Sequence, residues 1–209
     1  MSRYNVADGM GTGVSGMCAE NDFRSDGGPV RSFVAVAPPN DVLDRMASFV
    51  ARLRSLAPYK WVGRAQLHLT LRFLGEAPAS RVERIADALE GSGAGAFDIR
   101  LNRAGGFPNL TRPRVLWLGA DLGAKELAAL AERVEHIAVE TGFPPEPKRF
   151  SPHLTLARLR NAETPAGALS RALADAPSFS WRCERLFLVQ SRLTSTGPIY
   201  TTLREYPMR

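Results

Sequence analysis

Long apolar runs and cysteines are both scarce in this chain of 209 residues. It has no run of about 18 consecutive apolar residues, so it lacks a candidate transmembrane helix, and residues 1–25 hold no apolar segment typical of a secretory signal peptide. Its two cysteines, Cys18 and Cys183, are too few for a disulfide framework, and neither lies in a zinc-ligand spacing. We therefore expect a cytoplasmic protein without a membrane segment, a metal ion or another cofactor.

Blocks of five like charges are also missing, so the chain has no basic or acidic tail. Its 27 basic residues outnumber the 21 acidic ones, and the net charge of +6 favours a polyanionic partner such as nucleic acid. Only three of the basic residues are lysines (Lys60, Lys125 and Lys148), so a compositional preference for arginine is the alternative explanation. Charge alone does not decide between the two.

Residues 1–29 are rich in Gly, Ser, Asp and Asn and show no sustained apolar periodicity, which predicts a flexible leader. Within them, residues 11–16 match the G-x-G-x-x-G pattern of dinucleotide-binding turns. Such a turn needs a strand before it and a helix after it, and neither is predicted here, so we interpret the match as a flexible linker. The folded domain is expected over residues 30–209.

Beyond the leader, the apolar pattern repeats one order of elements: strand, helix, strand, helix. The first half predicts strands at 32–37 and 67–74, each followed by a helix, the first running from Asn40 or Asp41 to Leu56. The second half repeats this order with a strand at 115–118, a helix at 124–141, a strand at 152–159 and a helix capped by Thr164-Pro165. Segments around 97–107 and 179–206 add further strands. A duplicated fold with two facing lobes is the simplest account.

The tetrapeptide His-Leu-Thr-Leu occurs twice, at residues 68–71 and 153–156, and it uses two of the three histidines in the chain. Alternate side chains of a strand share a face, so His68 and Thr70 point one way while the leucines beside them point the other. The same alternation puts His153 and Thr155 on one face. A pseudo-twofold relation between the halves would therefore make both His-Thr pairs line one cleft.

Two imidazoles and two hydroxyls in one cleft suit metal-independent acid–base chemistry at a phosphorus atom. An imidazole has an ordinary pKa of about 6.5, so one ring can be neutral and accept a proton while its twin is protonated and donates one. Threonine hydroxyls can donate hydrogen bonds to non-bridging phosphate oxygens. Two histidines without a third ligand make a poor catalytic zinc site, and no G-x-S-x-G motif supports a serine hydrolase.

A non-catalytic interpretation of these residues also exists. A single His-x-Thr on a strand is usually a satisfied structural pair, and the third histidine, His136, is interpreted in that way, as structural or solvent-exposed. The repetition of His-x-Thr at matching positions of the two halves favours a catalytic role for the other two histidines.

These motifs resemble those of the two-histidine (2H) phosphoesterase superfamily. Residues 67–76 and 150–158 are similar to segments of RNA 2′,3′-cyclic phosphodiesterases, also called 2′-5′ RNA ligase-like proteins, with further matches at 31–36, 106–108 and 197–200. The resemblance implies an α+β, bilobal fold in which two antiparallel sheets flank a central basic cleft and the helices lie outside. It also implies hydrolysis of a terminal 2′,3′-cyclic phosphate to a 2′-phosphate, with His68 as proton donor to the 3′ oxygen and His153 as proton acceptor from water.

Three further residues, Arg72, Arg158 and Phe33, are candidates for substrate binding. Strict alternation gives Arg72 the parity of the first motif histidine, so it is expected to hold a phosphate or a neighbouring acid, or to be a solvated arginine at the strand end. Arg158 lies at an odd offset from the second motif histidine and reaches the site only if its strand bulges or ends there. Phe33, Phe150 or Tyr200 could stack on a base, although core packing is the commoner role of such residues.

We therefore expect a monomeric enzyme that hydrolyses 2′,3′-cyclic phosphates at RNA ends, such as those of cleaved tRNA, without an obligate protein partner. The same site would also suit a small cyclic nucleotide, or the reverse reaction that joins RNA ends in a 2′-5′ linkage. An alternative from a different class is a non-catalytic RNA-binding module, which the positive net charge would support.

Overall fold

The computed structural model describes residues 28–209 apart from 91, 93–94 and 196, so the 11–16 pattern and almost all of the expected leader lie outside the described residues. None of the helices in the described part is both long and apolar enough to cross a membrane. The helices are α1 (Asn40–Arg54), η1 (Arg64–Gln66, a short 3-10 helix), α2 (Ala79–Glu90), α3 (Ala124–Glu140) and α4 (Gly167–Ala174). The strands are β1 (Val30–Val36), β2 (Lys60–Trp61), β3 (Leu69–Ala77), β4 (Phe97–Phe107), β5 (Val115–Leu122), β6 (His153–Arg158), β7 (Phe179–Cys183), β8 (Arg185–Thr194) and β9 (Gly197–Pro207).

The predicted elements occur in the predicted order and differ mainly at their ends, while the short elements β2 and η1 were not predicted. α1 stops at Arg54, so the prediction that Leu56 belongs to its buried stripe is wrong, and Leu56 is 41% exposed. α4 starts at Gly167, and the predicted cap residue Thr164 instead donates a hydrogen bond from its hydroxyl to the carbonyl oxygen of Thr111. Because the Thr164 hydroxyl is hydrogen-bonded to another loop, it does not cap α4.

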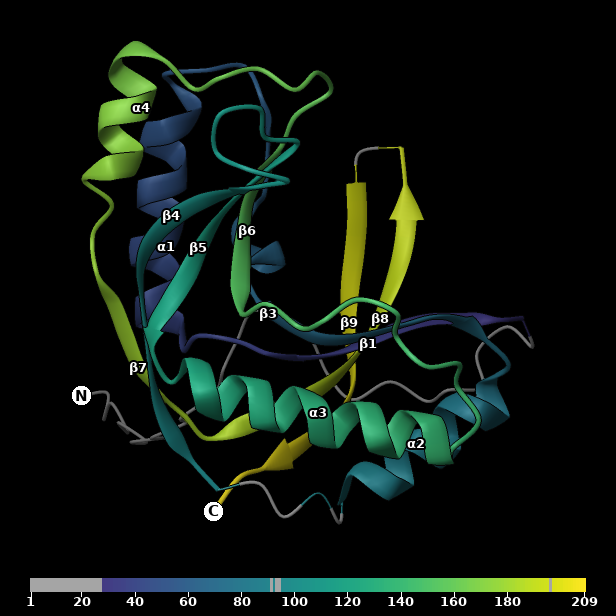
Figure 1. The fold of residues 1–209 in the computed structure, drawn as a ribbon. Helices are drawn as coiled ribbons and strands as arrows, with labels where there is room; N and C mark the ends of the chain where they lie inside the picture. Colours follow the sequence, from purple (N-terminus) through teal and green to yellow (C-terminus); the bar gives the residue numbers. More distant parts are fainter. Residues whose placement is uncertain (1–27, 91, 93–94, 196) are drawn as a thin grey trace, which may run out of the picture.

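The strands of the described part form one continuous, strongly curled antiparallel sheet (Figure 1). Its order is β7-β4-β5-β6-β3-β1-β8-β9, with β2 beside β6. The two four-stranded parts, β7-β4-β5-β6 and β3-β1-β8-β9, meet at one registered pair, Leu69 of β3 opposite Leu154 of β6. The two antiparallel sheets that the resemblance implies are therefore joined at the centre of the two repeated motifs.

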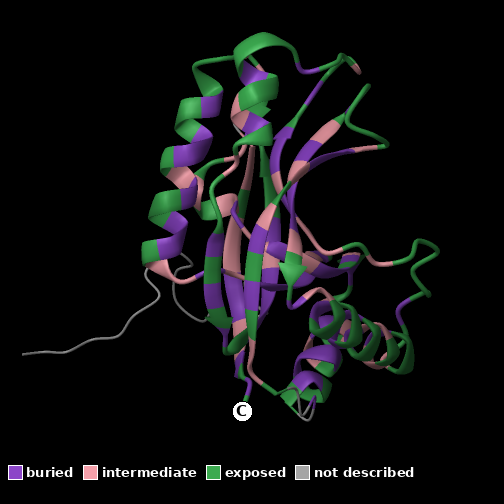
Figure 2. Cartoon of the chain, turned by 60° about the vertical axis from the view of Figure 1, so that its left-hand side comes forward, coloured by how far each residue is buried: buried purple, intermediate pink, exposed green. Residues whose placement is uncertain are grey.

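The helices cover the outer faces of this sheet, and α1 and α3 each pack against elements from the other half of the sequence. α1 connects β1 to β3 along the chain, yet it packs against β7 of the other lobe. Conversely, α3 connects β5 to β6 and packs on β3 and α2. One cluster of buried apolar side chains consequently runs through both lobes, and Figure 2 shows buried residues along the strands and on the helix faces turned toward them.

The two motif strands each carry an extra residue at the same point. In β3, Thr70 pairs with Ala35 of β1 and Arg72 pairs with Val34, so Leu71 is the additional residue. In β6, Thr155 and Ala157 pair with consecutive residues of β5, so Leu156 is the additional one. Such a bulge reverses the faces of the residues that follow it. The fifth residue after each motif histidine, Phe73 or Arg158, thus shares the face of that histidine. The fourth residue, Arg72 or Ala157, faces the core.

Two glycines with positive φ angles, Gly123 and Gly142, provide a test of these backbone constraints. Gly123 (φ +78°) caps the N-terminus of α3, and a Cβ there would overlap the carbonyl oxygen of Asp98. Gly142 (φ +93°) follows the same helix, and a Cβ there would meet nothing within 4 Å. We expect Gly142→Ala to lower the free energy of unfolding by about 1–2 kcal/mol through backbone strain alone. Gly123→Ala should lower it by a further ~1–3 kcal/mol through the added overlap.

Urea unfolding of the two variants measures this difference. Equal losses of stability would contradict the close approach of β4 to the start of α3.

Candidate active site

Both repeated motifs line one cavity of about 590 Å³ between the two lobes. The antiparallel pairing of Leu69 with Leu154 explains why, because one further residue of register in each direction sets His68 across from Thr155 and Thr70 across from His153. All four of these side chains line the cavity. The structure thus brings the two His-Thr pairs together in a single cleft, which we call the two-histidine cleft.

The rest of the lining of the two-histidine cleft is basic, aromatic, apolar or neutral polar. Arg31, Lys60 and Arg158 contribute positive charge, and none of the described lining residues is acidic. An anionic group in the cleft therefore meets three cations and no opposing carboxylate. The other lining residues are Phe33, Trp61, Val62, Gln66, Phe73, Ser191, Leu193, Gly197, Pro198 and Tyr200.

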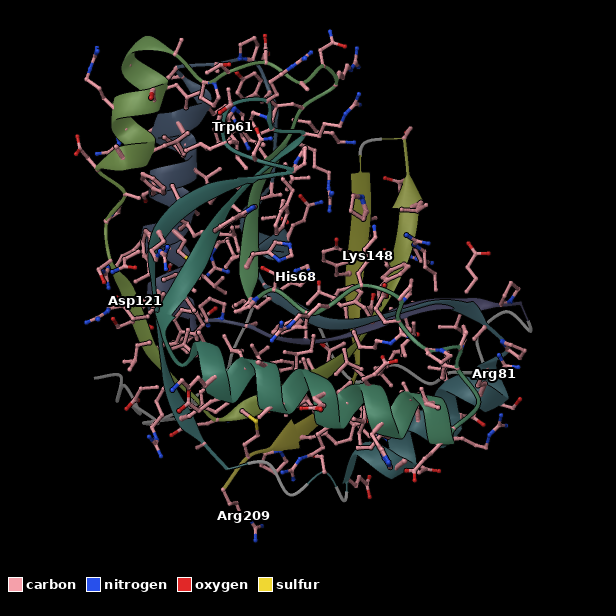
Figure 3. The ribbon with its side chains drawn as sticks, viewed as in Figure 1. Trp61, His68, Arg81, Asp121, Lys148 and Arg209 are labelled. Carbon is pink, nitrogen blue, oxygen red and sulfur yellow. The ribbon has the colours of Figure 1, made fainter. Side chains whose placement is uncertain are left out.

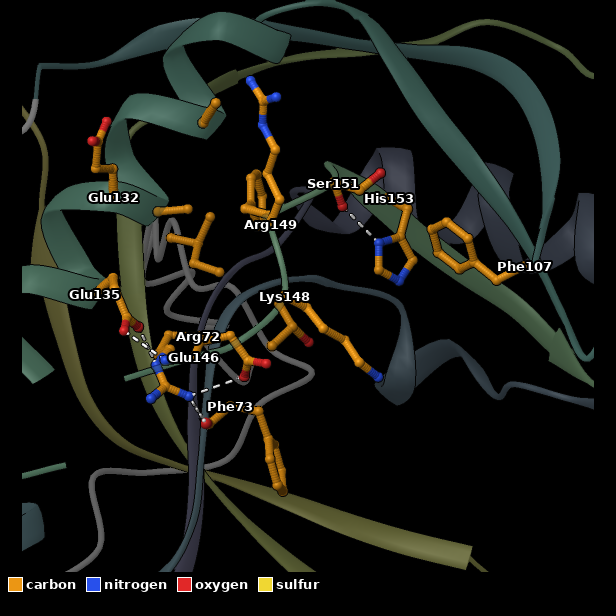
Figure 4. Close-up of a pocket in the computed structure, with 15 residues that line it drawn as sticks. Arg72, Phe73, Phe107, Glu132, Glu135, Glu146, Lys148, Arg149, Ser151 and His153 are labelled. Carbon is orange, nitrogen blue, oxygen red and sulfur yellow. Dashed lines mark hydrogen bonds and ion pairs between the residues drawn. The ribbon is translucent and has the colours of Figure 1, made fainter. Parts of the chain in front are cut away.

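The two imidazoles are anchored in the same way. His68 Nδ1 lies 2.8 Å from the carbonyl oxygen of Gln66, and His153 Nδ1 lies 2.8 Å from the carbonyl oxygen of Ser151 (Figure 4). A carbonyl oxygen only accepts hydrogen bonds, so Nδ1 carries the proton in both rings. Each neutral ring therefore keeps a lone pair on Nε2. That of His68 accepts a hydrogen bond from the Thr70 hydroxyl at 3.0 Å, whereas that of His153 has no such partner among the described residues.

Aromatic side chains hold each imidazole from two sides. The ring of His68 (labelled in Figure 3) stacks on Phe33 with 4.8 Å between centroids and meets the edge of Tyr200 at 5.3 Å. The ring of His153 contacts Phe107 edge-on at 4.9 Å and Trp117 at 6.4 Å. These contacts fix the ring planes, so the Nε2 atoms stay in place without relying on substrate.

Burial and nearby positive charge both favour the neutral form of these imidazoles. Burial lowers the pKa of His68 to about 4; the hydrogen bond to Gln66 opposes the shift, and the charges of His153 and Arg158 add to it. Burial also lowers the pKa of His153, with Arg158 again acting in the same direction. Both rings are therefore neutral at pH 7. An anion bound between them would raise both pKa values, because it stabilises the imidazolium form.

Arg72 does not lie in the two-histidine cleft, and the parity assigned to it from the sequence is wrong. The bulge at Leu71 turns Arg72 to the opposite face of β3, where it is 6% exposed. Its guanidinium forms ion pairs with Glu135 of α3 and with Glu146 (Figure 4). It also donates a hydrogen bond to the carbonyl oxygen of Pro144. Of the roles that the sequence leaves open, the structure shows the pairing with neighbouring acids.

Arg158 lies in the two-histidine cleft, because β6 bulges before it. As expected from the sequence, Arg158 needs such a bulge, or a strand end, to reach the site, because Arg158 lies at an odd offset from His153. Phe73 occupies the equivalent place after His68 and also lines the cleft. The equivalent positions after the two bulges therefore both line the cleft. One holds a cation, Arg158 of β6, and the other an aromatic ring, Phe73 of β3.

Phe33 lines the cleft, but it is only 3% exposed and packs on His68, so its face is already occupied by an imidazole. Sequence reasoning missed Arg31 and Lys60. Arg31 alternates with Phe33 along β1, so the period of two could have found it; its guanidinium lies 4.4 Å from the centre of the Phe73 ring. Nothing in the sequence near Lys60 indicates that the short strand β2 joins β6.

The remaining histidine and cysteine lie apart from this site. His136 is 74% exposed, and its Nδ1 lies 3.3 Å from the carboxylate of Glu140, one turn further along α3. This agrees with its interpretation as a structural or solvent-exposed residue. Cys183 is buried, and burial raises the pKa of its thiol to about 12. Within the described ranges, no three His, Cys, Asp or Glu side chains gather as a set of metal ligands.

Comparisons with known proteins agree with this geometry. The model of the 2′-5′ RNA ligase superfamily matches residues 42–194. An RNA 2′,3′-cyclic phosphodiesterase of Aeropyrum pernix is 41% identical over 167 residues, which cover 77% of this chain and 95% of that protein. One of Aquifex aeolicus is 35% identical over 151 residues, covering 70% of this chain and 80% of that protein. The chain therefore belongs to the 2′-5′ RNA ligase superfamily of 2H phosphoesterases.

Solved structures of similar proteins share the fold. TT0787 of Thermus thermophilus has a TM-score of 0.67 at 32% identity, with 86% of this chain and 98% of that chain covered. LigT of E. coli in complex with 3′-AMP has a TM-score of 0.68 at 26% identity, with the same shares covered.

The low pKa of His68 predicts a loss of stability in mild acid. The pKa of His68 is about 4 in the folded chain against an ordinary 6.5, so below pH 6.5 the unfolded chain binds the proton more readily. The free energy of unfolding should therefore fall as the pH drops from 6.5 to 4, by about 3 kcal/mol in total. Denaturant unfolding at several pH values measures this slope.

A matched pair of variants isolates the contribution of His68. His68→Gln should flatten most of the slope between pH 6.5 and 4, whereas His136→Gln, at an exposed position, should leave it unchanged. An unchanged slope in His68→Gln would show that another group causes it.

Proposed function

We propose that this chain opens 2′,3′-cyclic phosphates at the ends of RNA strands, such as cleaved tRNA, and leaves a 2′-phosphate. The observation that carries this proposal is the pair of anchored imidazoles, whose Nε2 lone pairs share a cleft that the described residues line with three cations and no acid. The names of the relatives support it, because the proteins of Aeropyrum pernix and Aquifex aeolicus are RNA 2′,3′-cyclic phosphodiesterases. So does the 3′-AMP complex of the E. coli relative.

In the proposed reaction, the cyclic phosphate lies between the two imidazoles. Water attacks the phosphorus atom opposite the bond to the 3′ oxygen, and His153 Nε2 takes the proton that the water loses. As the bond from phosphorus to the 3′ oxygen breaks, His68 Nε2 gives a proton to that oxygen. The direction of the two roles follows the family, and the unpartnered Nε2 of His153 agrees with its role as acceptor.

Substrate charge prepares His68 for its role as donor. Burial and Arg158 keep this imidazole neutral while the cleft holds no anion, since they lower its pKa to about 4. The negative charge of the cyclic phosphate opposes both effects, so the proton enters together with the substrate. Protonated His68 Nε2 then donates, toward the Thr70 hydroxyl at 3.0 Å or toward the leaving oxygen.

Hydroxyl and guanidinium donors stabilise the negative charge that develops on the non-bridging oxygens of the phosphate. Thr70 and Thr155 lie beside the imidazoles of the opposite strand, and Arg158 lies at the end of β6 in the same cleft. Fixed donors that are already oriented in a partly buried site contribute more than mobile water. No step of this scheme uses a metal ion. With the 5′-hydroxyl of another RNA strand in place of water, the same groups would act in the same roles and form a 2′-5′ linkage, again with the 3′ oxygen as leaving group.

The three histidines allow a test with an internal control. With EDTA present, we expect the wild-type protein to convert an oligonucleotide with a 2′,3′-cyclic phosphate end to a 2′-phosphate. His68→Ala and His153→Ala should each lower kcat about 10²–10⁴-fold, and His136→Ala should not change it. Full activity in both cleft variants would exclude the proposal, and RNA binding without turnover by wild type would favour a binding module.

Arg158 should affect both substrate binding and the histidine pKa values. Arg158→Gln removes a charged donor from the cleft, so we expect KM to rise about tenfold. The pKa values of His68 and His153 should rise together, because Arg158 lowers both. Steady-state kinetics and an NMR titration of the imidazole protons measure the two effects. Arg160→Gln, an exposed residue outside the cleft, is the control; an equal effect there would contradict the assignment.

A further inference from the structure

A second cavity of about 820 Å³ opens beside the two-histidine cleft (Figure 4). It shares Thr70, Phe73 and His153 with that cleft, so the two cavities meet at the reacting groups. One wall is α3, which contributes Ala128, Ala131, Glu132 and Glu135 along a single helix face, and the opposite wall is the segment 146–151 that leads into β6. A site that holds only the cyclic phosphate and its own nucleoside does not require this second space.

Aromatic and basic side chains gather in the second cavity. Phe73, Phe107 and Phe150 offer ring surfaces, and Lys148 and Arg149 are exposed cations on the segment that precedes His153. No carboxylate of the described residues lies within ion-pair distance of Lys148 or Arg149. Rings that stack on bases beside cations that follow a phosphate backbone are the features by which proteins bind single-stranded nucleic acid.

Two of the three acids in this cavity are paired with one arginine, which offsets one of their two negative charges. Arg72, for which the sequence left open a phosphate, a neighbouring acid or solvent as partner, forms ion pairs with both Glu135 and Glu146. Glu135 also accepts a hydrogen bond from the backbone N–H of Glu146. Only Glu132 of α3 is left without such a pairing in the described part. The repulsion that three carboxylates would exert on an RNA phosphate is thereby reduced, and Lys148 and Arg149 determine the local charge near His153.

We infer that the second cavity holds the nucleotide that precedes the cyclic-phosphate end, with its base against the aromatic rings and the linking phosphodiester near Lys148 and Arg149. This inference rests on the proposed function. The volume is in the range of cavities that hold a nucleotide-sized ligand. The enzyme therefore selects strands over free cyclic nucleotides, because only a strand fills both cavities.

The test compares two substrates with the same terminal base: a mononucleoside 2′,3′-cyclic phosphate and a trinucleotide that ends in one. Wild type should have at least about tenfold higher kcat/KM for the trinucleotide, as one charged contact is worth that much. Ala128→Trp fills the second cavity from an exposed helix position and should lower this preference severalfold or more. Ala129→Trp, exposed on the same helix but outside the cavity, should keep the preference.

Charge variants give an independent readout. Lys148→Ala and Arg149→Ala should each lower kcat/KM for the trinucleotide up to about tenfold, with a much smaller effect on the mononucleotide. They should also reduce the salt dependence of KM for the trinucleotide, by about 0.7 in the logarithmic slope for each lost phosphate contact. Lys125→Ala, on α3 but outside the cavity, should change neither quantity.

The possible outcomes separate the two proposals. No turnover of either substrate by wild type would overturn the proposed function and this inference with it. Equal kcat/KM for the two substrates, or an equal loss for both in Ala128→Trp with a normal melting temperature, would overturn the subsite alone. A preference that Ala128→Trp and the charge variants abolish, and the control variants keep, supports it.

Discussion

The antiparallel pairing of Leu69 with Leu154 is the contact on which the site depends. It joins the two parts of the sheet at the middle of the two repeated motifs, so each histidine lies across from the threonine of the other motif. A slip of one residue in this register would turn both His-Thr pairs into the core. Leu69 and Leu154 on the other face, both at 0% exposure, prevent such a slip because their burial would be lost. The geometry of the two-histidine cleft and core packing are thus set by one pair of strands.

The sequence predicts the four cleft residues well and the residues beyond them poorly. Strict alternation holds from His68 to Thr70 and from His153 to Thr155, where local periodicity is sufficient. It fails one residue later, because each strand has a bulge at the second leucine of the motif. Arg72 is therefore buried and Arg158 lines the cleft, the reverse of what alternation predicts. Bulges depend on the pairing of neighbouring strands, which the sequence of one strand does not contain.

The order of elements was also predictable, whereas their assignment to lobes was not. Repeated strand–helix units indicate a duplication, but α1 and α3 pack on the lobe opposite to the expected one. Helix packing depends on long-range contacts that a local apolar stripe does not specify. Long-range contacts also place Lys60, whose two-residue strand joins the cleft only because β2 pairs with β6. They likewise place the aromatic rings that flank each imidazole.

The pairing of β1 with β8 has a consequence for when this site can exist. Ser32 pairs with Gln190, and Tyr200 of β9 contacts the ring of His68, so the last strands of the chain complete the surroundings of the first motif. A chain still emerging from the ribosome contains both motifs before it contains this hairpin. Contacts of such large sequence separation form late and slowly. The cleft is therefore assembled only after β8 and β9 have been synthesised, and a nascent chain without them has no finished site with which to act on nearby RNA.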